Sequence, residues 1–206
     1  MPRPRKRSDA EILEVARAVF LEQGPSASMA DVARQLGLTQ PALSSRFGSK
    51  QALLLRALAP ALNADWISAL ERLPDARPFP AQLRELGVRA MELLEVAVPC
   101  MMTIRVAGVG ALASEGATKL PHARVRDAVV GVFSRALARG LVRDAEPERM
   151  AMMLIGSLQA RAMMAYVEGR ALATAERSAH VDAVVDVLWR GLQPERQDHA
   201  KGQERA

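Results

Sequence analysis

The spacing of apolar residues limits the fold of this chain more than any other feature. These residues recur about every 3.6 positions, which places them on one face of a helix, and no segment shows the period of two of a half-buried strand. The last segment carries an i, i+3, i+4, i+7 stripe that includes Val181, Val185 and Leu188. We therefore expect an all-α fold.

Glycine, proline and capping residues divide this pattern into separate helices. Ser8 and Glu11 form a capping box at the first helix, and Ser28 and Thr39 are good caps for two short ones. The longer helices are expected at about 50–73 with an interruption at Pro60, and at 80–98, 100–112, 123–140, 148–168 and 175–192.

Composition narrows the function classes. Hydrophobic residues make up 50% of the 206 residues, enough for a buried core, while aromatic residues make up only 3%. A reader of single-stranded nucleic acid that stacks bases on aromatic rings is therefore disfavoured. Cys100 is the one cysteine, so an intrachain disulfide and a multi-thiolate zinc site are excluded, and we expect a cytoplasmic protein.

Charge separates the start of the chain from the rest. The net charge is +5, and Arg3, Arg5, Lys6 and Arg7 crowd into a basic arm at the N-terminus. Such an arm is either a solvated tail or a strand that enters the minor groove of DNA. The apolar tract 93–113 contains Glu95 and Arg105, so we expect a soluble helical core there and no membrane partner.

Two short capped segments joined at Gly37 have the form of a helix-turn-helix. Gly37 permits a tight turn, and the segment after it presents Gln40 and Arg46, side chains that hydrogen-bond to adenine and guanine edges in the major groove. Short capped helices with polar outer faces also occur in many helical proteins, so the spacing alone leaves both interpretations open.

The residues themselves resemble a known family. The run from Met29 to Leu43, MADVARQLGLTQPAL, and the run FGSKQALL that begins at Phe47 resemble the N-terminal domain of TetR-family transcriptional regulators. The resemblance covers about residues 8–58. It implies a three-helix DNA-binding domain followed by a larger helical domain that binds a ligand and forms a homodimer.

The resemblance also implies which residues contact double-stranded DNA. They fall at the start of the second helix, on the exposed face of the recognition helix and at the start of the fourth helix: Ser28, Met29, Thr39, Gln40, Pro41, Ala42, Ser44, Ser45, Arg46 and Lys50. Lys50 matches a lysine that contacts phosphate. Ser44 departs from the family, which usually has tyrosine there, so its contact ranks below those of Lys50 and Gln40.

Methionines gather in the later part of the chain, where they suit an irregular core or an adaptable apolar cavity. The resemblance favours a cavity, and we expect a small apolar effector, with an acidic group near Arg105. The residues proposed to line its site are Trp66, Met101, Met102, Arg105 and Met163.

Other chemistry finds little support. Gly108, Gly110 and Ala113 fit a dinucleotide-binding spacing, but no strand precedes them and no long helix is expected after them. Three distant histidines make a metal site improbable. We expect neither a cofactor nor an enzyme.

These interpretations predict three parts: a DNA-binding domain with its arm at 1–50, a helical domain at 51–193 and a polar tail at 194–206. The last two helices offer apolar residues, among them Leu154, Val184 and Leu188, for a dimer interface. The expected function is a repressor released from a palindromic operator by its ligand. The alternative is a helical small-molecule-binding protein or enzyme with a vestigial DNA-binding domain.

Overall fold

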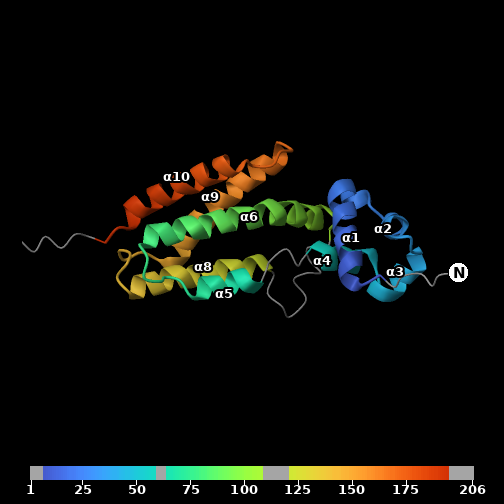
Figure 1. Ribbon diagram of the computed structural model, residues 1–206, viewed down its shortest axis with the longest axis horizontal. Helices are drawn as coiled ribbons and strands as arrows, with labels where there is room; N and C mark the ends of the chain where they lie inside the picture. The colour runs from blue at the N-terminus through green and yellow to red at the C-terminus, as the bar shows by residue number, and fades with distance from the viewer. Residues whose placement is uncertain (1–6, 59–63, 109–120, 195–206) are drawn as a thin grey trace, which may run out of the picture. The chain divides into compact units, whose positions relative to one another are not determined.

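The computed structural model describes residues 7–58, 64–108 and 121–194, and every regular element in these ranges is a helix (Figure 1). The all-α expectation is confirmed. The elements are α1 Asp9–Gln23, the 3₁₀ turn η1 Gly24–Ser26, α2 Met29–Leu36, α3 Gln40–Phe47, α4 Lys50–Leu58, α5 Ala64–Glu71, α6 Phe79–Val106, α8 Pro121–Ala138, α9 Pro147–Val167 and α10 Thr174–Leu192.

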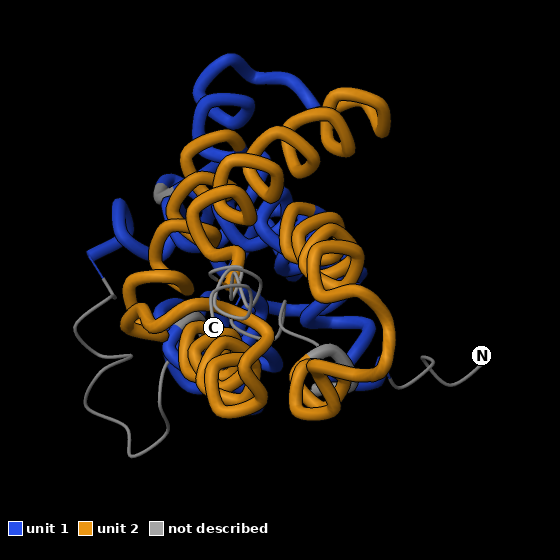
Figure 2. Tube along the Cα trace, turned by 90° about the vertical axis from the view of Figure 1, so that its left-hand side faces the viewer, with its two compact units in different colours: residues 1–64, 92–124, 162–171 blue, residues 65–91, 125–161, 172–206 orange. Residues whose placement is uncertain are grey.

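The chain divides into two compact units, coloured separately in Figure 2. Unit 1 comprises Met1–Ala64, Glu92–Arg124 and Ala162–Ala171, and unit 2 comprises Asp65–Met91, Val125–Arg161 and Leu172–Ala206. Helices α6 and α9 therefore contribute residues to both units. The functional division predicted at residues 50 and 193 stays a prediction.

The predicted caps of the first helices are present. The Ser8 backbone N–H donates to Glu11 Oε2 at 2.7 Å, and the Glu11 N–H donates to Ser8 Oγ at 3.2 Å, which completes the capping box of α1. Arg17 then ties α1 to α4 by donating from Nε to the Ala57 carbonyl at 2.9 Å. These contacts fix the ends and the pairing of the helices on which the recognition helix rests.

Unit 1 has a core that joins the first four helices to the end of α6. Ile12 and Phe20 of α1 and Leu53 of α4 are fully buried, and Cys100 of α6 belongs to the same cluster. Ile104 and Ala107 pack against it. Burying each large apolar side chain contributes about 1.5–3 kcal/mol. The end of α6 is thus part of the packing that holds the first helices together.

Helix α6 corrects one sequence prediction. The segments predicted at 80–98 and 100–112 form a single helix that continues through Pro99. Proline removes one backbone hydrogen bond and costs about 3 kcal/mol inside a helix. Val98 and Cys100, on either side of it, are both buried. Their burial offsets that cost, and the helix persists.

Unit 2 is a bundle of α10, most of α5 and α8, and the first parts of α6 and α9. Phe79 of α6 packs edge-to-face on Phe133 of α8, with ring centroids 6.1 Å apart. A Cβ added to Gly87 of α6 would lie 2.6 Å from Cγ1 of Val181 in α10, so glycine allows these two helices to approach closely.

Helices α9 and α10 bury more of their apolar residues within the chain than the sequence pattern predicted. Leu154 and Leu188, which were offered for a dimer interface, are buried within the chain, as are Met150, Leu158, Val181 and Val185. Other apolar side chains of the same helices are exposed instead: Met152 at 61%, Met153 at 58% and Val187 at 69%. By length and hydropathy α9 alone among the described helices would pass as a membrane span, as core helices of soluble proteins also do.

Candidate nucleic-acid interface

Helices α2 and α3 are joined by a turn whose geometry depends on Gly37. Gly37 has φ 66° and ψ 29°, a left-handed conformation that glycine adopts without strain. The Leu38 N–H donates to the Ala33 carbonyl at 2.9 Å, and the Leu38 side chain packs against the core of unit 1. Thr39 caps α3 by accepting from the Ala42 N–H at 3.4 Å. The predicted helix-turn-helix is therefore formed.

Helix α3 has one buried face and one exposed face. Leu43 and Phe47 point into the core, with 0% and 5% of their surfaces exposed. The exposed positions coincide with five predicted DNA-contacting residues: Gln40, Pro41, Ala42, Ser45 and Arg46. Thr39, at the cap, is exposed as well. A helix anchored in this way can present its polar face to a major groove while its apolar face stays packed.

The start of α2 offers backbone groups. Ser28 and Asp31 form a capping box in which the Ser28 N–H and hydroxyl donate to Asp31 Oδ2 at 2.9 and 2.5 Å. The residue Met29 is buried, so a contact with DNA through its backbone N–H is more suitable than one through its side chain. In the described part of the chain the N–H groups of Met29 and Ala30 have no acceptor. They are suitable donors to a phosphate oxygen.

Hydrogen bonds from Ser28 lower the pKa of Asp31, and the nearby guanidinium of Arg34, whose Nη2 lies 2.9 Å from Asp31 Oδ1, acts in the same direction. The carboxylate therefore stays ionised and keeps the first turn of α2 closed.

Lys50 begins α4, where the positive end of the helix dipole favours an anion. The residue before it caps this helix, and the cap was not predicted from the sequence. Ser49 Oγ accepts from the Ala52 N–H at 3.1 Å. The signal that reveals this cap is a serine directly before a helical apolar pattern.

Ser44 differs from its neighbours on α3. Its hydroxyl lies 3.8 Å from Sδ of Met29, and the residue is only half-exposed. The side chain thus points toward α2, where a tyrosine would project farther. The predicted contact of Ser44 with DNA stays a prediction.

Arg46 makes contacts that the sequence pattern does not reveal. One guanidinium nitrogen pairs with Asp9 Oδ1 at the start of α1, and the other donates to the Arg7 carbonyl at 2.7 Å. Arg56 of α4 donates to Asp9 Oδ2 at 3.2 Å, and its guanidinium carbon lies 4.7 Å from the centroid of the Phe47 ring. Asp9, Arg46 and Arg56 come from three different helices, and no local sequence motif links them.

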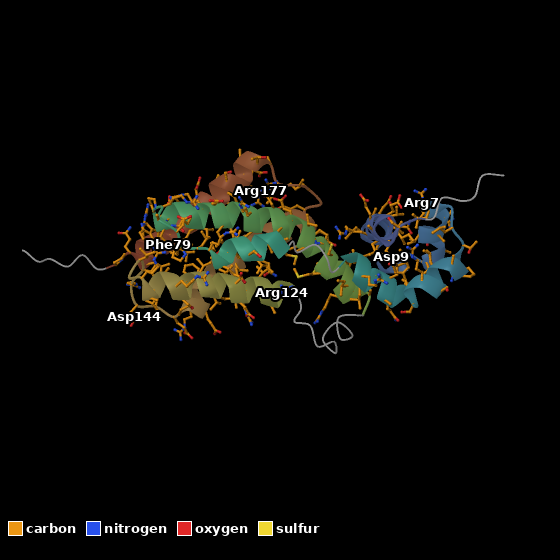
Figure 3. All side chains as sticks on the ribbon, turned by 60° about the horizontal axis from the view of Figure 1, so that its bottom comes forward. Arg7, Asp9, Phe79, Arg124, Asp144 and Arg177 are labelled. Atoms are coloured by element: carbon orange, nitrogen blue, oxygen red, sulfur yellow. The ribbon has the colours of Figure 1, made fainter. Side chains whose placement is uncertain are left out.

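Figure 3 labels Arg7 and Asp9 at the N-terminal end of α1, where the chain enters the described region. Arg3, Arg5 and Lys6 of the basic arm lie outside the described residues, as do Pro60 and most of the glycine spacing that begins at Gly108.

The fold and this site can now be compared with known proteins. Residues 12–57 match the family of bacterial regulatory proteins named tetR. Residues 12–57 are thus a TetR-family DNA-binding domain. Members of this family regulate transcription by binding DNA and are not enzymes. Among curated proteins, no sequence matches this TetR-family regulator.

Solved structures share the fold along most of the regulator. A TetR-family regulator from Mesorhizobium loti is 22% identical, with a TM-score of 0.74 over 90% of this chain and 96% of that one. PfmR, a TetR-family regulator from Thermus thermophilus, is 24% identical, with a TM-score of 0.68 over 87% and 97%. The fatty acid degradation regulator FadR from Bacillus halodurans is 13% identical, with a TM-score of 0.68 over 89% and 96%.

The predicted effector residues of the regulator lie mostly on α6. Met101 and Met102 are half-buried, and Met163 of α9 is half-buried as well. Arg105 is exposed, so its charge is solvated and needs no buried counter-ion. The side chain of Trp66 lies outside the described residues. The effector site stays a prediction.

Proposed function

We propose that this TetR-family regulator is a homodimeric repressor that binds a palindromic operator and releases it when a small apolar effector binds. The observation that carries the proposal is the exposed polar face of α3, held on a buried Leu43 and Phe47. Gln40 reads base edges at the start of that face, and Lys50 contacts the phosphate backbone. A homodimer places two such helices about 34–36 Å apart in successive major grooves.

The exposed apolar side chains of α9 and α10 support the dimer. Met152, Met153 and Val187 leave more than half of their surfaces in water. Large apolar side chains are costly to expose, and surfaces that gather them are typical of protein interfaces. We place the partner subunit there, on the face opposite to the buried residues that the sequence pattern favoured.

The packing of α6 supports a route from effector to DNA. From the sequence, the helix that begins at Lys50 is the expected link between sensor and reader. The end of α6 provides a second link, because Cys100 lies in the same core as α1 and α4. An effector that contacts Met101 or Met102 acts on the next residues of that helix and so on the seat of the recognition helix.

The chemistry of the effector follows from its proposed neighbours. Methionine side chains are flexible and suit aliphatic ligands of varying shape. FadR, which shares the fold, is named as a regulator of fatty acid degradation. We therefore choose saturated fatty acids of increasing chain length as probes. The protein is expected to act in the cytoplasm, where the single thiol stays reduced.

Selection from random duplexes tests the proposal. The full-length protein should enrich a palindrome whose half-sites are separated by one helical turn, or by a multiple of it. Gln40→Ala should relax the sequence preference within each half-site, whereas Lys50→Ala should weaken all duplexes alike and reduce the salt dependence. A protein that enriches no sequence would be a carrier or an enzyme with a vestigial domain instead.

Release is tested on the selected duplex. Addition of a fatty acid that acts as effector should lower the fraction of DNA bound. The same concentration of fatty acid should raise the Tm of the protein, because an effector that releases DNA must bind the DNA-free protein more tightly than the DNA-bound protein. The control variant is Arg149→Ala, which removes only a surface ion pair with Glu146 and should release DNA as the native protein does. DNA binding that no member of the series changes would contradict an acyl effector.

A further inference from the structure

The contacts of Arg46 suggest a role different from reading a base. Arg46 stands in the last turn of the recognition helix, at a predicted DNA-contacting position. Its guanidinium already has two partners, the Asp9 carboxylate and the Arg7 carbonyl. Arg7 ends the basic arm and Asp9 begins α1, so both partners lie where the arm joins that helix.

We propose that Arg46 is a positioning residue that ties the root of the N-terminal arm to the recognition helix and so directs the arm's cations onto operator DNA. The inference rests on the proposed function, because the arm is positioned only if α3 lies on DNA. A guanidinium is suited to this role, since its planar fork can donate to a carboxylate and a carbonyl at once.

The surroundings of the pair favour a fixed geometry. Asp9 also accepts from Arg56, 3.2 Å away, so the carboxylate joins α1 to both α3 and α4. The guanidinium of Arg56 stacks over Phe47, whose ring is buried in the core. Each exposed ion pair alone contributes little, but here one carboxylate is held by two arginines from two helices.

The link holds Arg7, where the arm joins the described chain, against the recognition helix. Arg7 is the last described residue of the arm, and its carbonyl lies 2.7 Å from Nη1 of Arg46. The next residues toward the N-terminus include Lys6, Arg5 and Arg3. These cations are one to four residues from Arg7 in sequence, so the proposal assigns them the phosphates or the minor groove next to α3.

A direct contact of Arg46 with DNA makes different predictions from a positioning role. If Arg46 binds a base or phosphate, its removal costs affinity whether or not the arm is charged. If it positions the arm, its removal costs affinity only while the arm carries its cations. A double-mutant cycle separates the two, because coupling appears only when the two parts act together.

The cycle combines Arg46→Ala with neutralisation of the arm by Arg3→Ala, Arg5→Ala and Lys6→Ala in the full chain. With the native arm, Arg46→Ala should weaken binding to the selected duplex about three- to tenfold, the cost of ordering an arm that is no longer held. In the chain with the neutralised arm, Arg46→Ala should change affinity less than about twofold, because an arm without cations has no DNA contact for Arg46 to order. Neutralisation should lower the slope of log K against log salt by up to about 0.9 for each phosphate that the arm no longer neutralises.

Two further variants test the geometry and guard against misfolding. Arg46→Lys keeps the charge but not the planar fork, so it should reproduce the loss seen with Arg46→Ala; full rescue by lysine would overturn the proposal. Asp9→Asn removes a negative charge near DNA, which by charge alone should strengthen binding. We expect weaker binding instead, whereas Glu14→Gln on the same helix should strengthen it slightly or leave it unchanged.

The outcomes are distinct. Equal losses from Arg46→Ala in both arm backgrounds, or no loss in either, would overturn the inference and leave the proposed function intact. A native protein that selects no duplex would overturn both. Near-native Tm values for the variants establish that affinity changes do not reflect unfolding.

Discussion

Val187 and Leu188 are consecutive residues of α10, yet 69% of the Val187 surface is exposed and only 6% of that of Leu188. The two side chains therefore face different surroundings. Leu188 belongs to the interior of unit 2, whereas Val187 is exposed, as are Met152 and Met153, and we assign these three residues to the interface with a second subunit.

This contrast predicts two different results for the same kind of substitution. Val187→Glu combined with Met153→Glu should give a folded monomer, because charges are placed where a partner is expected. Leu188→Glu should unfold the protein, since an unpaired charge in a core costs several kcal/mol. Sedimentation and thermal denaturation distinguish the two. Ala138→Glu, an exposed position of α8, controls for the added charge. A double variant that still dimerises would place the interface elsewhere.

Val187 and Leu188 also show which features of the fold can be predicted from the sequence and which cannot. Periodicity assigned both helices and their apolar faces correctly, because spacing determines which residues share a side. It did not reveal which apolar residues the chain covers itself, since that depends on packing between helices far apart in sequence. The predicted break of the helix at Pro99 was wrong for the same reason. Burial of Val98 and Cys100 offset the cost of a proline inside a helix.

In the candidate DNA interface, too, local features were predicted from the sequence and long-range contacts were not. Caps at Ser8, Ser28 and Thr39 are local, and all three are confirmed. The link from Arg46 to Asp9 joins residues far apart in sequence, and only the folded chain brings them together.

Gly37 should tolerate substitution poorly although space is open around it. No atom lies within 4 Å of an added Cβ, so the cost of Gly37→Ala arises from its φ of +66° alone. We expect a loss of roughly 1–2 kcal/mol in the free energy of unfolding. Denaturant titration measures it. Gly191→Ala, which also meets no neighbouring atom but lies in a helix with ordinary φ, should instead be neutral or stabilising. Equal effects at both positions would contradict a cost that arises from φ.

Asp31 gives the start of α2 a dependence on pH. Its pKa is lowered by hydrogen bonds from Ser28, so it binds a proton more weakly in the folded than in the unfolded protein. Its contribution to stability is thus complete above about pH 4 and is lost as pH falls through the lower, folded pKa. Asp31→Asn should remove this part of the pH dependence. Thermal denaturation of both proteins between neutral and acidic pH would test it, and parallel curves would refute the assignment.

Cys100 should report on the packing of α6. The thiol is buried and burial raises its pKa, so two factors reduce its reactivity. Iodoacetamide should modify it slowly in the native protein and rapidly in denaturant. If an effector shifts α6, the rate in the native protein should change when the effector is added. Rapid modification of the untreated protein would contradict the packing of α6 against the first helices.

The shared core of α1, α4 and the end of α6 has a consequence for engineering new sensors. Designers who exchange modules between regulators would cut after residue 58, at the end of α4. The resulting N-terminal fragment would lack Cys100 and the side chains packed beside it. Its DNA-binding helices would then expose apolar surface that α6 covers in the whole protein. A chimera must therefore import the last turns of α6 with the first four helices, so the transferable module of this protein is discontinuous in sequence.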